Sequence, residues 1–411
     1  MIQKLVDLAL RQRFLILILG LLLLIWGGIS FYKLPIEAYP DIAPQWVQVI
    51  TQWPGHAAEE VATQISVPIE TAMYGIRNMT AMRSHTIFGL SVVTMTFNDQ
   101  SNDLWNREQV LERLSGVTLP HGIKPALGPD YSPVGQIYWY TLESSNPHYD
   151  LMNLKALQDW VINRHLKSVP GVVGDSSFGG LTREYQVRLN PNRLIEYNLT
   201  IHDVERALQA NNFNAGGGFF QHGQQMFDVR SIGMVRNTKD IGRIFLKEVN
   251  GTPIYMRDVG RVVVGHLVRL GQIGKAVREP NGTIVDNNDV VEGIVLLQKG
   301  ASTEKTLAGV MAEVHKLNHG MLPRGVKIVP YINRLDLIHY TTHTVLRNLA
   351  IGFLLVTVVL LIFLGNARTA LIVAGTIPFS LLFAFTCLNL RHIPANLLSL
   401  GALDFGMVVD G

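Results

Sequence analysis

The sequence predicts a mixed membrane protein: an α-helical transmembrane bundle plus an extracytoplasmic α+β region with ferredoxin-like βαββαβ repeats. Three observations predict this class. Hydrophobic residues make up 48% of the 411 residues, and the mean hydropathy of +0.21 is high for a soluble protein. Uncharged apolar stretches lie at residues 14–32, 348–367 and 369–390. Between the first two, about 300 residues alternate between strand and helix patterns, which predicts a large folded region on one side of the membrane.

The N-terminal segment predicts a membrane anchor. Residues 1–13 form an amphipathic, cytoplasmic start, and residues 14–34 form the first predicted transmembrane helix. Its uncharged run makes about 28 Å of helix, enough to cross the hydrocarbon core. A cleaved signal peptide is the alternative, but no small-x-small cleavage site follows the apolar run. Arg11 and Arg13 on its N-terminal side place the N-terminus in the cytoplasm.

Residues 35–133 carry most of one βαββαβ unit. Strands are expected where apolar and β-branched residues gather or alternate, and helices where apolar residues recur at helical spacing. Pro68 is expected to kink or break the first helix. The order strand, helix, strand, strand, helix is most of a split βαβ unit. The expected strands are residues 45–52, 79–86 and 90–97, and the expected helices are residues 57–73 and 102–115.

The same order recurs in residues 134–180 and 277–335, divided by an insertion at residues 181–276. The repeat is architectural, without clear residue identity between the two copies. In the second copy, strands are expected at residues 134–142, 172–178, 290–297 and 326–331, and helices at 150–169 and 303–317. In the insertion, we expect strands at residues 184–189, 226–232 and 257–264, a helix at 201–210 and a flexible loop at 211–218.

Three more spans are expected after the extracytoplasmic region, at residues 340–367, 369–390 and 394–411. Arg368 in the first short junction agrees with a cytoplasmic position, whereas Arg391 in the next junction weakly opposes the positive-inside tendency. Pro378 should kink the third span.

Two carboxylates, Asp404 and Asp410, lie in the last apolar segment. A charge at the centre of a bilayer costs at least ~2.5–3.5 kcal/mol, so such residues face protein or water and mark an ion or proton path. Their spacing separates them by about 120° around a helix, whereas Gly406 and Asp410 share one face, where another helix can pack closely. Two alternatives stay open. In the first, the segment is a buried helix of a soluble protein and Asp404 is an ordinary helix cap. In the second, the segment spans the membrane but Asp404 and Asp410 have a purely structural role.

The run Leu-Gly-Ala-Leu-Asp404-Phe-Gly-Met-Val-Val-Asp410-Gly resembles the fourth transmembrane helix of resistance-nodulation-division (RND) exporters. It resembles the heavy-metal efflux branch, the cobalt–zinc–cadmium type, in which Asp-Phe-Gly is followed after three residues by Asp-Gly. The drug-exporting branch has two adjacent Asp here, where this sequence has Asp410 and Gly411, and the copper/silver group usually lacks the first Asp. The resemblance therefore implies divalent cations. It also implies a protein more than twice as long, so we expect this chain to be an N-terminal fragment.

The resemblance assigns parts to the extracytoplasmic region. Residues 35–133 would be porter subdomain 1, residues 134–180 and 277–335 porter subdomain 2, and the insertion at residues 181–276 the docking subdomain. Asn214, Gly216, Gly217 and Gly218 resemble the long docking hairpin that reaches into a neighbouring subunit. A plain flexible loop is the alternative for these glycines. The implied assembly is a homotrimer in the lipid of the bacterial inner membrane, with a large periplasmic domain, a periplasmic adaptor protein and an outer-membrane channel.

Composition and motifs exclude several function classes. The net charge of +3, without a basic tract, gives no reason to expect nucleic acid. The single cysteine, Cys387, excludes an internal disulfide and a zinc-cysteine cluster. There is no nucleotide-binding G-x-x-x-x-G-K-[ST] loop and no hydrolase or kinase motif. We therefore expect a secondary transporter, not an enzyme, with no cofactor.

The hypothesis is a proton-driven antiporter that exports divalent metal ions of the zinc, cobalt, cadmium and nickel class, with Asp404 and Asp410 as the proton relay. A proton moving inward gains ~2.3 kcal/mol per 100 mV. The alternatives are a drug or amphiphile exporter of the same superfamily and a membrane-anchored sensor or assembly protein that transports nothing.

Metal ligands stay unassigned. His315 with His319, and His339 with His343, have the i, i+4 spacing at which two imidazoles can share a zinc or nickel ion. Solvated helix surface is the simpler interpretation of both pairs. The methionines Met73, Met79 and Met82 are expected to fill a core. The resemblance places the main metal site largely beyond Gly411, and the sequence does not name the metal.

Overall fold

The computed structural model describes residues 11–34, 36–37, 39, 41–269, 271–391 and 393–396. This described chain divides into two compact units. Unit 1 comprises the chain up to Glu143, Val161–Ser177 and the chain from Gly293 onward, and unit 2 comprises Ser144–Trp160 and Phe178–Glu292.

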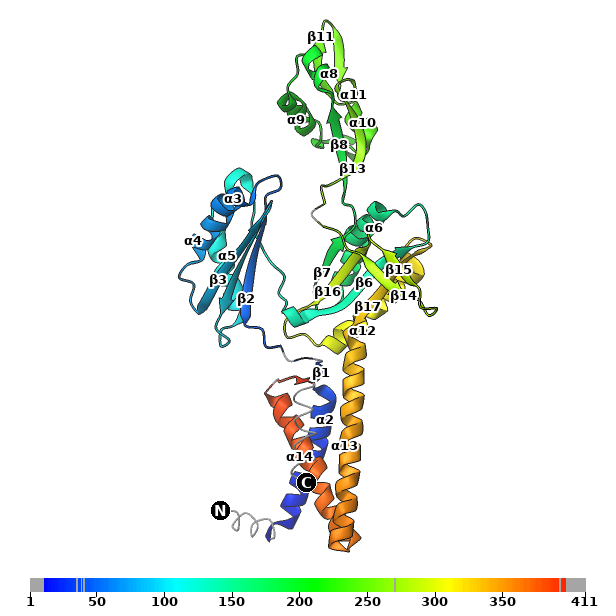
Figure 1. Ribbon diagram of the computed structural model, residues 1–411. Helices are drawn as coiled ribbons and strands as arrows, with labels where there is room; N and C mark the ends of the chain where they lie inside the picture. Colours follow the sequence, from blue (N-terminus) through cyan, green and yellow to red (C-terminus); the bar gives the residue numbers. More distant parts are fainter. Residues whose placement is uncertain are drawn as a thin grey trace. The chain divides into compact units, whose positions relative to one another are not determined.

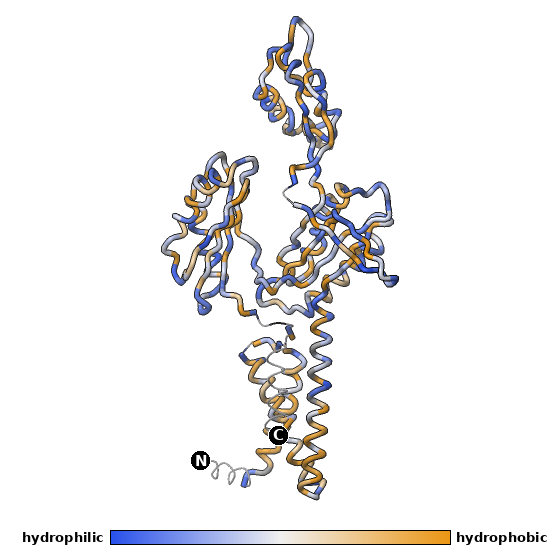
Figure 2. The backbone as a smooth tube through the Cα atoms, viewed as in Figure 1, coloured by the Kyte–Doolittle hydropathy of each residue, from blue (hydrophilic) through white to orange (hydrophobic). Residues whose placement is uncertain are grey.

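Among the described residues of unit 1, three helices are long and apolar enough to cross a membrane: α2 (Arg13–Lys33), α13 (Arg334–Leu364) and α14 (Ala367–Leu390). Figure 2 shows α2 and α14 as mainly hydrophobic, and α13 as mixed in its first half and mainly hydrophobic in its second. Helix α13 begins earlier than the predicted span at 340–367, because the Asn333 side chain accepts from the Leu335 backbone N–H and caps a helix that starts directly after β17 (Val326–Asn333). It ends at Gly365, which has φ +59°.

Helices α2 and α14 approach closely in unit 1. A Cβ atom on Gly27 would lie 2.6 Å from the Leu382 Cβ and 3.0 Å from the Leu382 carbonyl oxygen, so glycine is needed at this crossing. The rings of Phe31 and Phe385 have centroids 4.9 Å apart, and the Asn389 amide donates to the hydroxyl of buried Ser30 over 3.3 Å.

The first four-stranded sheet has the order β3-β4-β2-β5. Strand β4 alternates between half-buried and buried residues, as a sheet with one covered face requires, and pairs antiparallel with both β2 and β3. Helices cover the buried face with a core that includes Ile65, Met73 and Val110, and Met79 and Met82 pack against that core, as expected. Near Pro68 the first helix contains a π-helical turn. The elements are β2 (Gln45–Gln52), α3 (Ala58–Val61), the π-helical turn Ala62–Ser66, α4 (Val67–Met73), β3 (Met79–Ile87), β4 (Leu90–Phe97), α5 (Asp103–Ser115) and β5 (Ala126–Leu127).

The second four-stranded sheet has the order β17-β6-β16-β7. Counted along the chain, both sheets therefore place their strands in the same order: fourth, first, third, second. All seven residues of β16 are buried, as suits an inner strand covered on both sides. The elements are β6 (Gln136–Ser144), α6 (Leu151–Leu157), the π-helical turn Gln158–Ile162, α7 (Asn163–Lys167), β7 (Val172–Gly179), β16 (Val291–Leu297), α12 (Thr303–Lys316), the π-helical turn Leu317–Met321 and β17.

Unit 2 contains the insertion, with a core of its own around Met256, Val259 and Val204. Strands β8 and β13 pair antiparallel along their whole length, and β9 with β10 and β14 with β15 form separate hairpins (Figure 1). The elements are β8 (Arg183–Leu189), α8 (Pro191–Glu196), α9 (Ile201–Ala210), β9 (Ala215–His222), β10 (Gln225–Ser231), α10 (Thr238–Gly242), β11 (Phe245–Val249), β12 (Thr252–Tyr255), α11 (Met256–Val259), β13 (Gly260–His266), β14 (Lys275–Arg278) and β15 (Ile284–Asn287).

Candidate functional site

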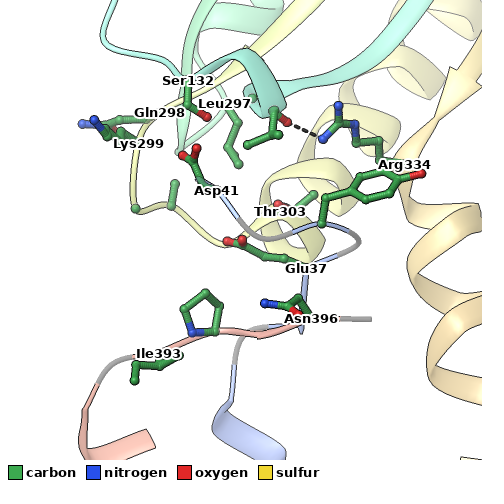
Figure 3. Close-up of a pocket in the computed structure, with 16 residues that line it drawn as sticks. Glu37, Asp41, Ser132, Leu297, Gln298, Lys299, Thr303, Arg334, Ile393 and Asn396 are labelled. Atoms are coloured by element: carbon green, nitrogen blue, oxygen red, sulfur yellow. Dashed lines mark hydrogen bonds between the residues drawn. The ribbon is translucent and has the colours of Figure 1, made fainter. Parts of the chain in front are cut away.

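A charged cavity in unit 1 lies where the chain leaves α2 and α14 and where it enters α13 (Figure 3). Its volume is about 330 Å³. It is lined by the segment after α2, the turn between β16 and α12, the first residue of α13 and the segment after α14. The lining residues used below are Glu37, Tyr39, Asp41, Val134, Lys299, Arg334 and Asn396.

A short parallel strand pair holds two of these segments together. Strand β1 (Ile36–Glu37) pairs with β18 (Ala395–Asn396), with Ile36 opposite Ala395 and Glu37 opposite Asn396. Ala395 is buried against Leu34 and Phe385. The backbone that precedes the predicted fourth span is thus fixed to the backbone that follows the first span.

Glu37 and Asp41 bring negative charge to the cavity. Burial, and then repulsion from Asp41, raise the pKa of the Glu37 carboxyl, while Arg334 lowers it less. In Figure 3 the side chain of Glu37 extends into the cavity. The raised pKa means that this half-buried carboxyl takes up a proton more readily than an exposed glutamate.

Arg334 brings positive charge to the same cavity. Its guanidinium donates a hydrogen bond to the Val134 carbonyl and lies 5.9 Å from the ring centroid of Tyr39, within cation–π range. Since Arg334 opens α13, these contacts fasten the start of that helix to the segment before β6. Neither Glu37 nor Arg334 was predicted from the sequence, where the only signal was their position as charged residues close to apolar spans.

The β9–β10 hairpin contains the predicted docking residues. The glycines are not in a loop: Gly216, Gly217 and Gly218 lie in β9, which corrects the flexible loop expected at residues 211–218. The register shifts there, so Gly217 and Gly218 together face the single residue Val229. Such a bulge favours a left-handed residue, and Gly218 has φ +81°. The glycines are therefore explained by the bulge and by close approach to Val229, whose Cγ1 would lie 3.0 Å from a Cβ on Gly217.

Asn214 fixes the base of this hairpin. Its side-chain oxygen accepts from the backbone N–H groups of Gly233 and Met234, over 3.1 and 3.2 Å. Every residue of β9 and β10 is exposed, including Phe219, Phe220 and Phe227. The hairpin is thus an ordered extension whose aromatic side chains are not covered by the described chain.

In the part of the chain that the structure describes, no group of three or more His, Cys, Asp or Glu is placed to hold a metal. The rings of His315 and His319 stack with centroids 4.0 Å apart, and Nδ1 of His319 donates to the His315 carbonyl over 2.9 Å. His339 and His343 lie exposed on α13.

The predicted relay residues Asp404 and Asp410, with Gly406 beside them, lie outside the described residues. Strand β18 ends eight positions before Asp404, so the described chain reaches the segment that leads into the relay.

Comparison with known proteins gives one consistent result. Residues 5–411 match the family described as AcrB/AcrD/AcrF. The whole chain is 37% identical to the cobalt-zinc-cadmium resistance protein CzcA of Cupriavidus metallidurans, covering 38% of it. It is 37% identical to protein HelA of Legionella pneumophila, covering 39% of it, and 34% identical to the cation efflux system protein CusA of Escherichia coli, covering 39% of it.

A solved structure agrees with these relatives. The chain is similar to the crystal structure of a heavy metal efflux pump, with a TM-score of 0.86 and 43% identity, covering 99% of this chain and 40% of the other. The chain spans about two-fifths of the length of the relatives it matches.

Proposed function

Because the chain belongs to the AcrB/AcrD/AcrF family, within the RND exporters, we propose that it is part of an inner-membrane pump that exports divalent heavy-metal cations in exchange for protons. The observation that carries this proposal is the likeness of the entire chain, at 43% identity, to a heavy metal efflux pump. Its curated relatives include proteins named for cobalt, zinc and cadmium resistance and for nickel and cobalt resistance.

Asp404 and Asp410 supply the proton path in this proposal. Desolvation raises a carboxylate's pKa, whereas a nearby cation lowers it, so both groups can take up and release a proton as their surroundings change. Protonation from the outside and release to the inside then drive outward metal movement with the membrane potential. The metal ion and the protons are substrates, and the proposal needs no cofactor.

The extracytoplasmic region takes the porter and docking roles. The strand order shared by the two sheets supports two βαββαβ porter subdomains, and the separate core of the insertion supports a docking subdomain. The fully exposed β9–β10 hairpin supports a homotrimer in which the hairpin contacts the neighbouring subunit. A periplasmic adaptor and an outer-membrane channel would complete the export path.

The test is metal tolerance of cells that lack their own metal pumps and express the full reading frame that contains this chain. We expect protection against one or two of zinc, cobalt, cadmium and nickel, and loss of protection with Asp410→Asn. Asp99→Asn, a change to an exposed aspartate, is the matched control and should keep protection.

Two results would overturn the proposal. Equal protection by the Asp410→Asn variant and the unchanged protein would show that Asp410 is not needed as a proton relay. No protection against any metal, with the protein present in the membrane, would favour a drug exporter, and tolerance to amphiphilic drugs would then be measured next.

A further inference from the structure

Two histidines at the end of α12 lie with their rings together on the surface. His315 is in the last turn of α12 and His319 is in the π-helical turn that follows, and both residues are exposed. Their rings stack with centroids 4.0 Å apart and with planes tilted by 19°. In an α-helix, side chains four residues apart are offset by about 40° around the axis. The wider π-helical turn reduces this offset, so His319 comes to lie over His315.

One hydrogen bond selects the tautomer of His319. Its Nδ1 lies 2.9 Å from the His315 carbonyl oxygen. A carbonyl oxygen only accepts, so Nδ1 carries the proton and donates it. The neutral ring then has its free lone pair on Nε2, which is the nitrogen that can bind a metal ion. Donation of the other ring N–H to a backbone carbonyl is also the arrangement that orients histidines in metal sites.

The neighbours of His319 hold its backbone in place. The Asn318 side chain donates to the Ile328 carbonyl over 3.0 Å and accepts from the Ile328 N–H over 2.8 Å, which ties the turn to β17. The Leu322 N–H donates to the Leu317 carbonyl over 2.9 Å, and Leu317 is fully buried. The two rings therefore stand on an ordered support, so an ion that binds between them has little backbone to order.

The charged side chains beside the pair are engaged with each other. The Lys316 ammonium, next to His315 in the chain, donates to Glu313 Oε2 over 2.9 Å. Glu313 Oε1 lies 3.0 Å from Nδ1 of His165 on α7. Glu313 thus neutralises the lysine beside the pair, but its two oxygens are already occupied. The pair is therefore a site of two nitrogen ligands, in which water would complete the coordination of an ion.

We propose that His315 and His319 together bind a divalent transition-metal ion, zinc or nickel, on the surface formed by α12 and its π-helical turn. Imidazole suits zinc and nickel, whereas magnesium and calcium prefer oxygen ligands. Two nitrogens on one tetrahedral zinc ion lie about 3.3 Å apart at bond lengths of about 2.0–2.1 Å. Exposed rings with centroids 4.0 Å apart reach that separation through small side-chain rotations. A role in holding the ion before export rests on the proposed function; the binding itself does not.

The test measures nickel binding beside the pair in the full-length protein in lipid nanodiscs. A fluorophore is attached at Ala308→Cys, an exposed position about 10 Å along α12 from His315, where a bound nickel ion quenches its emission by short-range energy transfer. The exposed Cys387 is first replaced by serine. We expect saturable quenching by nickel. Zinc, which does not absorb visible light, should reverse the quenching by competition, and magnesium should not.

Variants separate the pair from other histidines. His315→Ala and His319→Ala each leave a single imidazole and should raise the nickel concentration at half-quenching by about tenfold or more. His202→Ala, at another exposed histidine, is the matched control and should leave this midpoint unchanged. An unchanged midpoint in His315→Ala or His319→Ala, or quenching that zinc does not reverse, would overturn the proposal. Because quenching reports only the surroundings of α12, its failure leaves the metal-tolerance test unaffected.

Discussion

Strands β16 and β9 are similar in length and opposite in environment. Each of the seven residues of β16 is buried, between β6 and β7 in a four-stranded sheet. Each of the eight residues of β9 is exposed, and its only strand partner in the described chain is β10. The apolar side chains of β16 are buried by other residues of the chain, whereas the side chains of Phe219 and Phe220 in β9 remain exposed.

The difference separates residues that are packed within the chain from residues that are free to contact another chain. An isolated two-stranded hairpin is marginally stable in water, and an exposed apolar edge invites another chain. Phe220 and Phe227 stack with ring centroids 5.3 Å apart on one face of the hairpin, which gives it some internal order. We therefore expect changes in β16 to affect unfolding and changes in β9 to affect association.

The largest expected effect is in β16. A Cβ atom at Gly293 would lie 2.2 Å from the Tyr140 ring, so Gly293→Ala forces the buried strand and ring apart and should destabilise the protein by about 2–3 kcal/mol. Thermal unfolding followed by intrinsic fluorescence would measure this. Gly216→Ala in β9, where a Cβ meets open space, is the control and should change stability by less than about 0.5 kcal/mol. Equal losses of stability in the two variants would show that β16 is no more important for folding than β9.

The second prediction reverses the contrast. Replacing Phe220 and Phe227 by serine should weaken the proposed trimer association by about 10–100-fold, because exposed aromatic anchors supply much of an interface's energy. The stability of the protomer should change by less than about 0.5 kcal/mol, as is usual for substitutions at exposed positions. Mass measurement of the detergent-solubilised protein checks the association. Tyr74→Ser, at another exposed aromatic, should leave it unchanged.

The third prediction concerns Tyr140 in β6, a strand that neighbours β16 in the sheet. The Tyr140 hydroxyl donates to Asp175 Oδ2 over 2.8 Å in the buried sheet. Tyr140→Phe removes this donor and should cost about 1–2 kcal/mol of stability. Chemical denaturation measures it, and Tyr331→Phe, at an exposed residue of β17, is the comparison. A loss of stability no larger than that of Tyr331→Phe would show that this hydrogen bond adds nothing to the sheet.

The smallest effect is a pH response on the helices beside this sheet. A hydrogen bond from Lys316, and to a lesser degree one from His165 on α7, lower the pKa of Glu313 on α12. A lowered acid pKa gives stability that is present above the ordinary value of 4.5 and is lost as the pH falls through the lowered pKa. Glu313→Gln should remove about 0.5 kcal/mol at neutral pH and flatten the acid limb of the stability curve. An unchanged acid limb would contradict this prediction.

The sequence predicts the parts of the fold that follow from periodicity and length. The apolar runs of α2, α13 and α14 were found directly, and strands such as β2 and β4 followed from their apolar and β-branched residues. In the hairpin, the glycines suggested a loop because the local pattern does not reveal a bulge, which depends on the register between two strands.

The candidate site was less accessible to sequence reasoning. Glu37, Arg334 and Asn396 come from three segments far apart in the chain, and only the β1–β18 pairing and the start of α13 bring them to one cavity. The relay motif at Asp404 and Asp410 stays a prediction from sequence.

Helix α13 begins directly after β17, so the helix and the second sheet are connected without an intervening loop. With 31 residues, α13 is about 46 Å long at 1.5 Å per residue. A tilt of about 5° at Arg334 therefore displaces the far end of the helix, at Leu364, by about 4 Å. Because Asn333 both ends β17 and caps α13, no loop lies between them to absorb a rotation. A small rotation of the sheet therefore produces a larger displacement at the far end of the helix.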